Sequence, residues 1–333
     1  MKKLLLTICV LSSLAGVSQD IHFSQFNVAP MVYNPALAGG FEGDMRFIGN
    51  QRTQWRSVTA PYSTIGVSAD FNHKNQPLMG SAFSIYQDRA GDSKLNTIAV
   101  NGAFSYEIAK SADELHTFTL GGQLGFTHRK IDYSDLNYDS QWNGFQYNAN
   151  ASSGEQFARD ARTYVNFNLG GAWQYRVDKR NSMEAGIALF NASGPQQSFF
   201  DDPSIRRDMR VSISGSGIIE LNDEWDAIGG LLFSVQGKYL EFIPGGGARY
   251  ILEDERGSFK TLFGGMYYRT KDAGFIMAGM DYDQWRVGLS YDINLSNLRP
   301  ASNGRGGFEL SVVYILTRFV PPPGRKRICP EYF

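Results

Sequence analysis

The chain has 333 residues, a formal net charge of -1 and a sequence pI near 6.4. This near-neutral balance argues against nucleic acid as a partner, because nucleic-acid binding needs a clear excess of Lys and Arg. Cys9 lies in a segment that we expect to be removed, so Cys329 is alone in the mature chain and a disulfide framework is excluded.

The first predicted element is a secretory signal peptide over residues 1–18. Lys2 and Lys3 give a basic start, residues 4–14 are mostly apolar, and Gly16-Val17-Ser18 has the small-x-small pattern of a cleavage site. No later run reaches the roughly 18 apolar residues that a spanning helix needs, which excludes a helical membrane protein. The chain is therefore expected to be periplasmic, secreted or an outer-membrane barrel.

Residues 19–43 form the next segment, which is rich in turn-forming residues around Tyr33, Asn34 and Pro35. We expect it on the periplasmic side of the membrane, or partly filling a barrel as a plug.

From residue 44 onward the dominant pattern is alternation with a period of two. Val165, Phe167 and Leu169, for example, alternate with Asn166 and Asn168. One side of such a strand suits lipid and the other suits water, as in a transmembrane β-barrel. About fourteen strands are predicted, at 44–55, 62–72, 78–89, 95–108, 115–130, 163–177, 182–191, 208–220, 224–236, 239–251, 258–269, 273–282, 284–294 and 306–318.

Strand length and connection length support the same fold. A strand of about 11 residues tilted by about 45° spans the roughly 25 Å apolar band of an outer membrane. The long connections 131–162, 192–207 and 295–305 all fall on one side of the strand order, and short turns fall on the other. We predict an all-β, antiparallel transmembrane outer-membrane β-barrel over residues 44–318, with its long loops outside and both chain ends in the periplasm.

The chain closes with a predicted periplasmic tail over residues 319–333. Pro321-Pro322-Pro323 cannot continue a β-ladder and is expected to be a stiff spacer. The basic cluster Arg325, Lys326 and Arg327 is either a solvated tail or a docking site for a periplasmic partner.

No catalytic, cofactor or metal site is predicted. The four histidines lack metal-ligand spacing, and no Ser-His-Asp or paired-carboxylate arrangement stands out, so we expect a non-enzyme without cofactors. The loop 135–139 has the D-x-N-x-D spacing that opens a calcium loop. Ser140 and Gln146 replace the Gly and Glu of that pattern, which favours an ordinary polar surface loop.

Several motifs resemble the PorP/SprF family of outer-membrane proteins associated with the type IX secretion system. These motifs are D-I-H-F-S-Q-F at 20–26, M-V-Y-N-P-A-L-A-G-G at 31–40, Arg52, Gln54-Trp55, Pro61, Asp70, Arg299-Pro300 and Cys329-Pro330. The resemblance implies a protein of the cell outer membrane that aids secretion or surface attachment of cargo, including adhesins in gliding relatives. It also implies three partners: membrane lipid, cargo with a type IX C-terminal domain, and periplasmic and lipoprotein components of the secretion machinery.

The long loops carry more aromatic residues than solubility requires, which indicates either a protein-binding surface or packing of the loops over the barrel mouth. A pore or transporter for small solutes and a purely structural barrel are the alternative functions. The predicted partner-binding residues are Tyr33, Asn34, Pro35, Arg52, Trp55, Trp142, Phe145, Phe199, Phe200, Arg325, Lys326 and Arg327.

Overall fold

The computed structural model describes residues 20–54, 61–73, 79–91, 94–133, 136, 138–148, 150–152, 158–255, 258–295 and 305–317. The predicted signal peptide, the predicted tail 319–333, and Trp55, Arg325, Lys326 and Arg327 lie outside these ranges.

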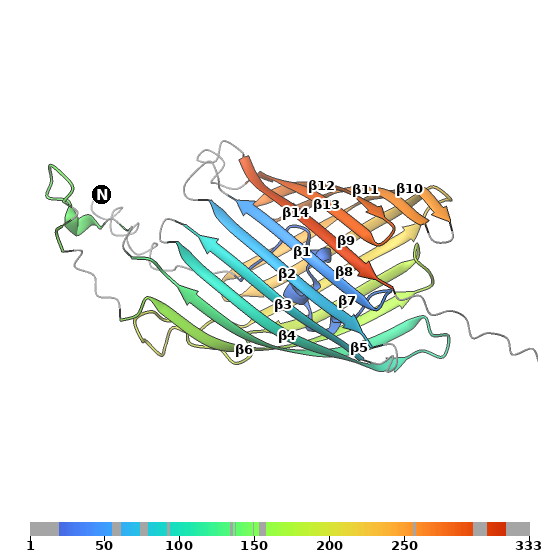
Figure 1. Ribbon diagram of the computed structural model, residues 1–333, viewed down its shortest axis with the longest axis horizontal. Helices are drawn as coiled ribbons and strands as arrows, with labels where there is room; N and C mark the ends of the chain where they lie inside the picture. Colours follow the sequence, from blue (N-terminus) through green and yellow to red (C-terminus); the bar gives the residue numbers. More distant parts are fainter. Residues whose placement is uncertain are drawn as a thin grey trace, which may run out of the picture.

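Fourteen antiparallel strands form a closed barrel in which each strand pairs with the next and β14 pairs with β1, so the predicted fold class is confirmed (Figure 1). The strands are β1 Met45–Gln54, β2 Tyr62–Asn72, β3 Met79–Ala90, β4 Leu95–Lys110, β5 His116–Lys130, β6 Ala161–Arg176, β7 Ser182–Phe190, β8 Arg210–Glu220, β9 Trp225–Gln236, β10 Tyr239–Glu255, β11 Ser258–Arg269, β12 Ala273–Tyr282, β13 Trp285–Asn294 and β14 Arg305–Leu316.

Most strand boundaries lie close to the predicted ones, and β10 shows why some differ. It continues to Glu255 rather than to residue 251, because a register shift between Ile251 and Glu253 lets it go on pairing with β11. Such a β-bulge adds a residue without ending the ladder. An alternation pattern read from sequence stops where the bulge changes its phase.

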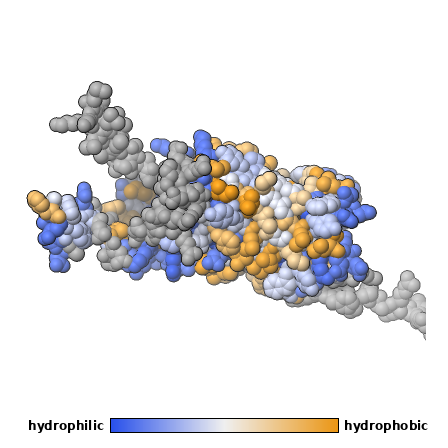
Figure 2. Space-filling model, turned by 90° about the horizontal axis from the view of Figure 1, so that it is seen from above, coloured by the Kyte–Doolittle hydropathy of each residue, from blue (hydrophilic) through white to orange (hydrophobic). Residues whose placement is uncertain are grey.

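The alternation arises because successive strand residues point to opposite sides of the wall. In β6 the outward Val165 and Phe167 are exposed, whereas the inward Tyr164 and Asn168 are buried. Figure 2 shows the result on one face, where apolar residues gather along the middle of the barrel between more hydrophilic ends. Among the residues that the structure describes, no helix has the length and apolar character needed to cross a membrane.

The two ends of the barrel differ. We call the end that carries the connections β5–β6 and β7–β8 the long-loop end, and the end that carries turns such as 177–181 between β6 and β7 the short-turn end. Aromatic pairs gather near the short-turn end, where Trp225 lies 4.8 Å from Tyr250 and Trp285 lies 4.5 Å from Tyr314, measured between ring centroids. Such girdles mark the lipid–water interface of membrane barrels.

Residues 20–43 lie inside the barrel, and we call this segment the plug (dark blue in Figure 1). It contains η1 Phe26–Val28, α2 Pro30–Tyr33 and η2 Pro35–Leu37. Asp20 pairs with Arg207 and Arg210 at the long-loop end, whereas Phe41 lies under Arg46 near the short-turn end. The plug therefore runs through the lumen from one end to the other, with Asp20 at the long-loop end. The side of the membrane on which the chain ends lie stays a prediction.

Candidate functional site

A turn in the plug is seated in a row of glycines on the barrel wall. The Asn34 side chain caps η2 by accepting a hydrogen bond from the Ala36 N–H (2.9 Å), and Pro35 at the first helical position suits that start. The Asn34 amide also donates to the carbonyl of Gly171 on β6 (3.0 Å). This turn therefore has its own local cap and a direct bond to the wall.

Glycine is needed at these wall positions because the plug lies too close to the wall for any side chain to fit between them. A Cβ on Gly121 of β5 would lie 2.5 Å from Ala36 Cα, and one on Gly170 of β6 would lie 2.1 Å from Asn34 Oδ1. A Cβ on Gly186 of β7 would lie 2.3 Å from Asn34 Nδ2. Adjacent strands β5, β6 and β7 thus form a cradle that side chains would fill.

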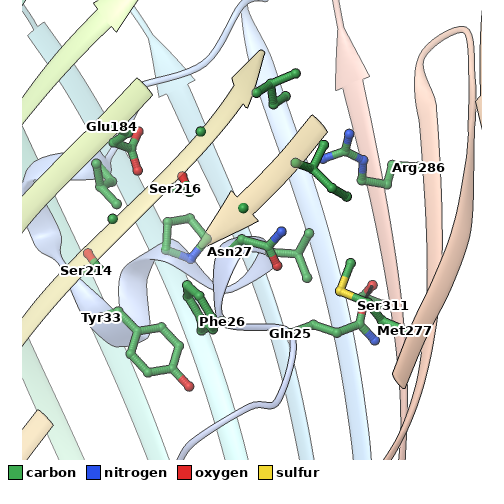
Figure 3. Close-up of a pocket in the computed structure, with 18 of the residues that line it drawn as sticks. Gln25, Phe26, Asn27, Tyr33, Glu184, Ser214, Ser216, Met277, Arg286 and Ser311 are labelled. Carbon is green, nitrogen blue, oxygen red and sulfur yellow. Dashed lines mark hydrogen bonds between the residues drawn. The ribbon is translucent and has the colours of Figure 1, made fainter. Parts of the chain in front are cut away.

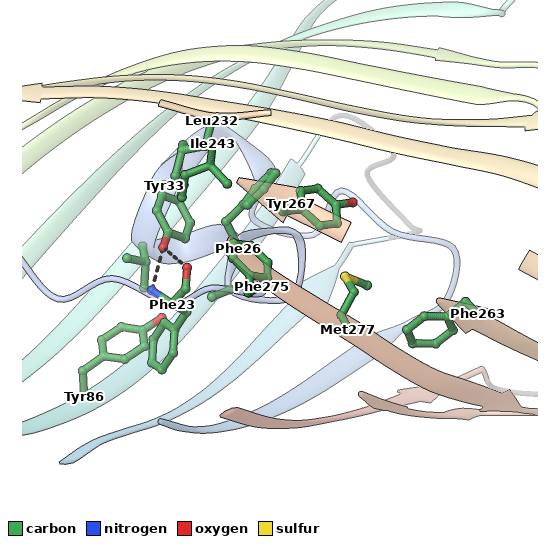
Figure 4. Packing of buried hydrophobic residues seen from close by; sticks show 12 residues of the cluster. Phe23, Phe26, Tyr33, Tyr86, Leu232, Ile243, Phe263, Tyr267, Phe275 and Met277 are labelled. Carbon is green, nitrogen blue, oxygen red and sulfur yellow. Dashed lines mark hydrogen bonds between the residues drawn. The ribbon is translucent and has the colours of Figure 1, made fainter. Parts of the chain in front are cut away.

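An apolar cluster joins the plug to the opposite wall (Figure 4). Phe23, Phe26 and Tyr33 pack there against side chains of β3 and β9–β12. The Tyr33 hydroxyl donates to the Phe23 carbonyl (2.9 Å) and accepts from the Phe23 N–H (2.7 Å), so its polar atom is satisfied. Burying each large apolar side chain contributes about 1.5–3 kcal/mol, so these contacts favour the seated plug.

A buried ionic cluster fixes the plug in the long-loop half of the lumen. Arg52 of β1 pairs with Asp292 of β13 (2.8 Å) and donates to the His22 carbonyl of the plug (2.9 Å). Arg269 of β11 also pairs with Asp292 (3.3 Å). Glu309 of β14 accepts the backbone N–H groups at 24 (2.6 Å) and 25 (2.9 Å). Removing one member of such a buried pair costs about 3–5 kcal/mol, because its partner loses its counter-charge.

Asp20, the first described residue, is held in place by ion pairs with Arg207 and Arg210. Burial alone would raise the pKa of its carboxyl group, but Arg207 and then Arg210 outweigh that effect and lower the pKa to about 2. Gln236 of β9 also donates to its carboxylate (2.9 Å). The start of the plug is therefore anchored as an ionised carboxylate at every physiological pH.

The described residues of the two longest connections, which span 131–160 and 191–209, make up what we call the long-loop face. Asp201 ties the two loops together by pairing with Arg159 (2.8 Å) and with Arg162 (2.8 Å). The Arg159 N–H also donates to the Phe199 carbonyl (3.1 Å). These contacts join the base of the β5–β6 connection to the β7–β8 connection on one side of the mouth.

One part of this face is a small hairpin with an aromatic tip. Trp142 and Tyr147 form an isolated β-bridge, and the Asn143 side chain accepts the N–H groups of Phe145 and Gln146 (2.9 Å each). Gly144 has a φ of +92°, which glycine adopts without strain. The Phe145 side chain is 93% exposed, so this turn presents an apolar ring to solvent.

The structure separates the predicted partner-binding residues into an inner and an outer group. Tyr33, Asn34, Pro35 and Arg52 are buried and contact the plug or the wall, so in this conformation they hold the plug. On the long-loop face, Trp142 and Phe200 are each 53% exposed, and Phe199 packs over Arg129. Their role in binding a partner stays a prediction.

Sequence reasoning missed the charged residues that hold the plug: Glu241, Arg269, Asp292 and Glu309. The available signal was a charged residue at an inward position of a lipid-crossing strand, where charges are rare unless paired. The loop 135–139, which we expect to be an ordinary polar loop rather than a calcium loop, is only partly covered, since Asp135 and Asn137 lie outside the described residues. Within the described ranges, no group of three or more His, Cys, Asp or Glu residues is placed to hold a metal ion.

Comparisons with known proteins agree with this architecture. A family model described as "Type IX secretion system membrane protein PorP/SprF" matches residues 15–314. No curated protein matches the sequence. The solved toluene transporter TodX of Pseudomonas putida is similar in fold, with a TM-score of 0.51, 11% identity, and coverage of 90% of this chain and 95% of TodX. The toluene transporter TbuX of Ralstonia pickettii gives a TM-score of 0.46 at 12% identity, covering 86% of this chain and 92% of TbuX.

Proposed function

The chain belongs to the PorP/SprF family of type IX secretion system membrane proteins, and from this membership we propose that it aids secretion or surface attachment of cargo proteins such as adhesins. It is an outer-membrane β-barrel, and its family and fold are those of secretion and channel proteins rather than of known enzymes. In this proposal the barrel works as a non-enzymatic scaffold, with cargo held on its outer side.

The observation that carries the proposal is the seated plug. The plug occupies the lumen along its length and is held by apolar, ionic and backbone contacts. A barrel closed by its own chain is better suited to holding a partner at the membrane than to passing it through the lumen. The surface left for cargo on the outer side is then the long-loop face.

The aromatic hairpin is the part of that face with the properties of a binding anchor. The Phe145 ring is almost fully exposed, whereas the turn that carries it is fixed by the Asn143 side chain. Aromatic residues that bury a ring in a partner often contribute most of the binding energy of an interface. A preformed turn also lowers the entropy lost on binding. We therefore assign cargo contact to Phe145 and Trp142, with Phe200 at the neighbouring loop.

The test is the amount of cargo held at the cell surface by the double variant Trp142→Ala, Phe145→Ala. Retention should fall at least about tenfold if the two rings contribute the 2 kcal/mol or more of interface anchors. Asn150→Ala, an exposed side chain in the same loop, is the matched control. Heat-modifiable gel migration should show equally inserted barrels. Unchanged surface cargo in the double variant would contradict this role of the loop.

A pore or transporter for small solutes is the second candidate, favoured by two cavities beside the plug. One of about 200 Å³ lies between the plug and β8–β9 (Figure 3). Another of about 850 Å³ lies toward the short-turn end. Both are lined by Asn27, Arg46, Arg249 and Arg286, so they adjoin. Steady conductance of the purified wild-type barrel in planar bilayers would favour the pore, whereas absence of conductance would favour the scaffold.

Contact with periplasmic and lipoprotein components belongs to the proposal as well, and we assign it to the short-turn side. The basic residues Arg325, Lys326 and Arg327 follow β14, which ends at that side. Deleting residues 324–333 should reduce co-purification of those components while leaving the barrel inserted. Equal recovery with the shortened chain would remove the tail from the proposal.

A further inference from the structure

Arg129 on β5 is a buried arginine without an acidic partner. The structure describes five buried arginines, namely Arg52, Arg129, Arg210, Arg249 and Arg269. Each of the other four makes an ion pair with a carboxylate, whereas Arg129, only 7% exposed, makes none. A buried guanidinium without a counter-charge is unfavourable, so this position needs an explanation.

The surroundings of Arg129 add positive charge. Its register partner on β6 is Arg162, so two inward-facing arginines lie directly opposite each other. Like charges in that position repel. Asp88, on the nearby wall, accepts a hydrogen bond from Thr64 (2.6 Å) and makes no ion pair with Arg129.

A neutral amide oxygen occupies the place where an anion would be expected. Gln197 Oε1, from the β7–β8 loop, accepts from Arg129 Nη1 (2.9 Å) and from Arg207 Nη1 (3.5 Å). Arg129 Nε has no hydrogen-bond partner, and the Phe199 ring covers the guanidinium at 5.8 Å. Gln196 Oε1 accepts in the same way from Arg162. Two neighbouring glutamines thus offer uncharged oxygens to three arginines.

The carboxylates in this cluster are already shared. Asp20 pairs with Arg207 and Arg210, and Asp201 pairs with Arg159 and Arg162. Asp88, which lies near Arg129 without pairing with it, is a third carboxylate, so five guanidinium groups lie among three carboxylates. The cluster therefore keeps an excess of positive charge at the mouth of the barrel, directly below the long-loop face.

We propose that this cluster is a binding site for a carboxylate, which displaces the amide oxygen of Gln197 and pairs with Arg129 and Arg207. A charged oxygen makes roughly twice as strong a hydrogen bond to a guanidinium as a neutral one does, so the exchange is favourable. Because Arg129 and Arg207 already meet at one oxygen, a carboxylate that takes the place of the Gln197 amide would reach both guanidinium groups. The inference rests on the proposed function for its source of ligand: an acidic side chain or the C-terminal carboxylate of the exported partner.

Gln197→Glu tests the site because it supplies the missing carboxylate from the protein itself. Thermal unfolding of the purified full-length mature barrel in detergent at low salt is followed with citrate, with hexaglutamate and with hexaglutamine as the neutral control. Both anionic probes should raise the melting temperature of the wild type, and hexaglutamine should not. In Gln197→Glu the melting temperature without ligand should rise, and the affinity for both probes should fall at least about tenfold, because the site is already filled.

Gln284→Glu is the matched control, since it adds the same charge in the β12–β13 turn at the opposite end of the barrel. It should respond to both probes like the wild type. If only hexaglutamate stabilises the wild type, the site prefers an acidic peptide. If citrate also stabilises it, the site accepts small polycarboxylates as well. The proposal is overturned if neither probe stabilises the wild type, or if Gln197→Glu binds them as tightly as Gln284→Glu does.

These measurements are independent of the secretion assay. Suppose that the wild type binds both anionic probes but the double variant Trp142→Ala, Phe145→Ala retains as much cargo as the wild type. That result would contradict the proposed function of the hairpin and would still support the carboxylate site. If the double variant loses cargo but the wild type binds neither anionic probe, the function of the hairpin is supported and the carboxylate site is contradicted.

Discussion

Gly121→Ala should unseat the plug, because the added methyl group meets backbone rather than side chain. The new Cβ would lie 2.5 Å from Ala36 Cα, 2.6 Å from Ala36 N and 2.6 Å from the carbonyl carbon of Pro35. No rotamer change relieves such contacts, so either the turn at η2 or strand β5 must move. Overpacking of this kind costs about 1–3 kcal/mol. Since 1.4 kcal/mol is a factor of ten, the ratio of seated to released plug should fall roughly fivefold to 150-fold.

The assay is maleimide labelling of Ala29→Cys in a Cys329→Ser background. Ala29 is 2% exposed, so labelling requires the plug to leave its place. When opening and closing are faster than labelling, the rate follows the released fraction and should rise by the same factor. Barrels with a released plug should also show greater conductance in planar bilayers.

Gly122→Ala is the matched control for this experiment. It changes the next residue of the same strand, on the lipid-facing side, where the nearest atoms to a new Cβ lie 3.9 Å and 4.0 Å away. It should leave the labelling rate unchanged. If Gly121→Ala labels no faster than Gly122→Ala, the close seating of the plug against β5 is wrong.

Three further predictions concern the contacts that hold the plug. The Asp20 carboxyl has a pKa lowered from 3.8 to about 2, so its stabilisation is complete above pH 3.8 and is lost as the pH falls toward 2. The melting temperature of the purified barrel should fall in that window, and Asp20→Asn should reduce this dependence on pH. Asn34→Ala removes the cap of η2 and the bond to β6, and should cost about 1–3 kcal/mol in urea unfolding. Arg52→Gln removes one of the buried cations that pair with Asp292, and it should lower the free energy of unfolding in urea by about 3–5 kcal/mol. A decrease below about 1 kcal/mol would show that the ionic cluster does not hold the plug.

The strands were predictable because their signal is local. Residues two apart share a side of the wall, so Val165, Phe167 and Leu169 report a lipid-facing row without knowledge of any neighbouring strand. The lengths of the connections also predicted that the long loops lie together at one end of the barrel. The observed strand boundaries differ from the predicted ones where the alternation in the sequence and the pairing of the strands disagree, as at the bulge in β10.

The exposed residues of the long-loop face were also partly readable. The excess of aromatics in these loops left open a protein-binding surface or packing over the barrel mouth; Phe145 and Trp142 are exposed, whereas Phe199 packs over Arg129. The role of the N-terminal motif was not readable in the same way. Asn34 and Pro35 read as a turn, and the wall that receives them comes from three strands that begin more than eighty residues later in the chain.

The amino-acid sequence by itself thus determined the barrel, its number of strands and which residues face lipid, since each follows from a period of two and from nearby turns. Only the closed tertiary structure decided where the plug runs, which glycines receive it, and which charges meet. Arg52 and Asp292 are 240 residues apart and become partners because β14, which pairs with both β1 and β13, closes the ring between their strands. Arg129 faces Arg162 through the pairing of β5 with β6, and Gln197 reaches it from the β7–β8 loop in place of an acid. Contacts of that range depend on the whole barrel and not on any segment of it.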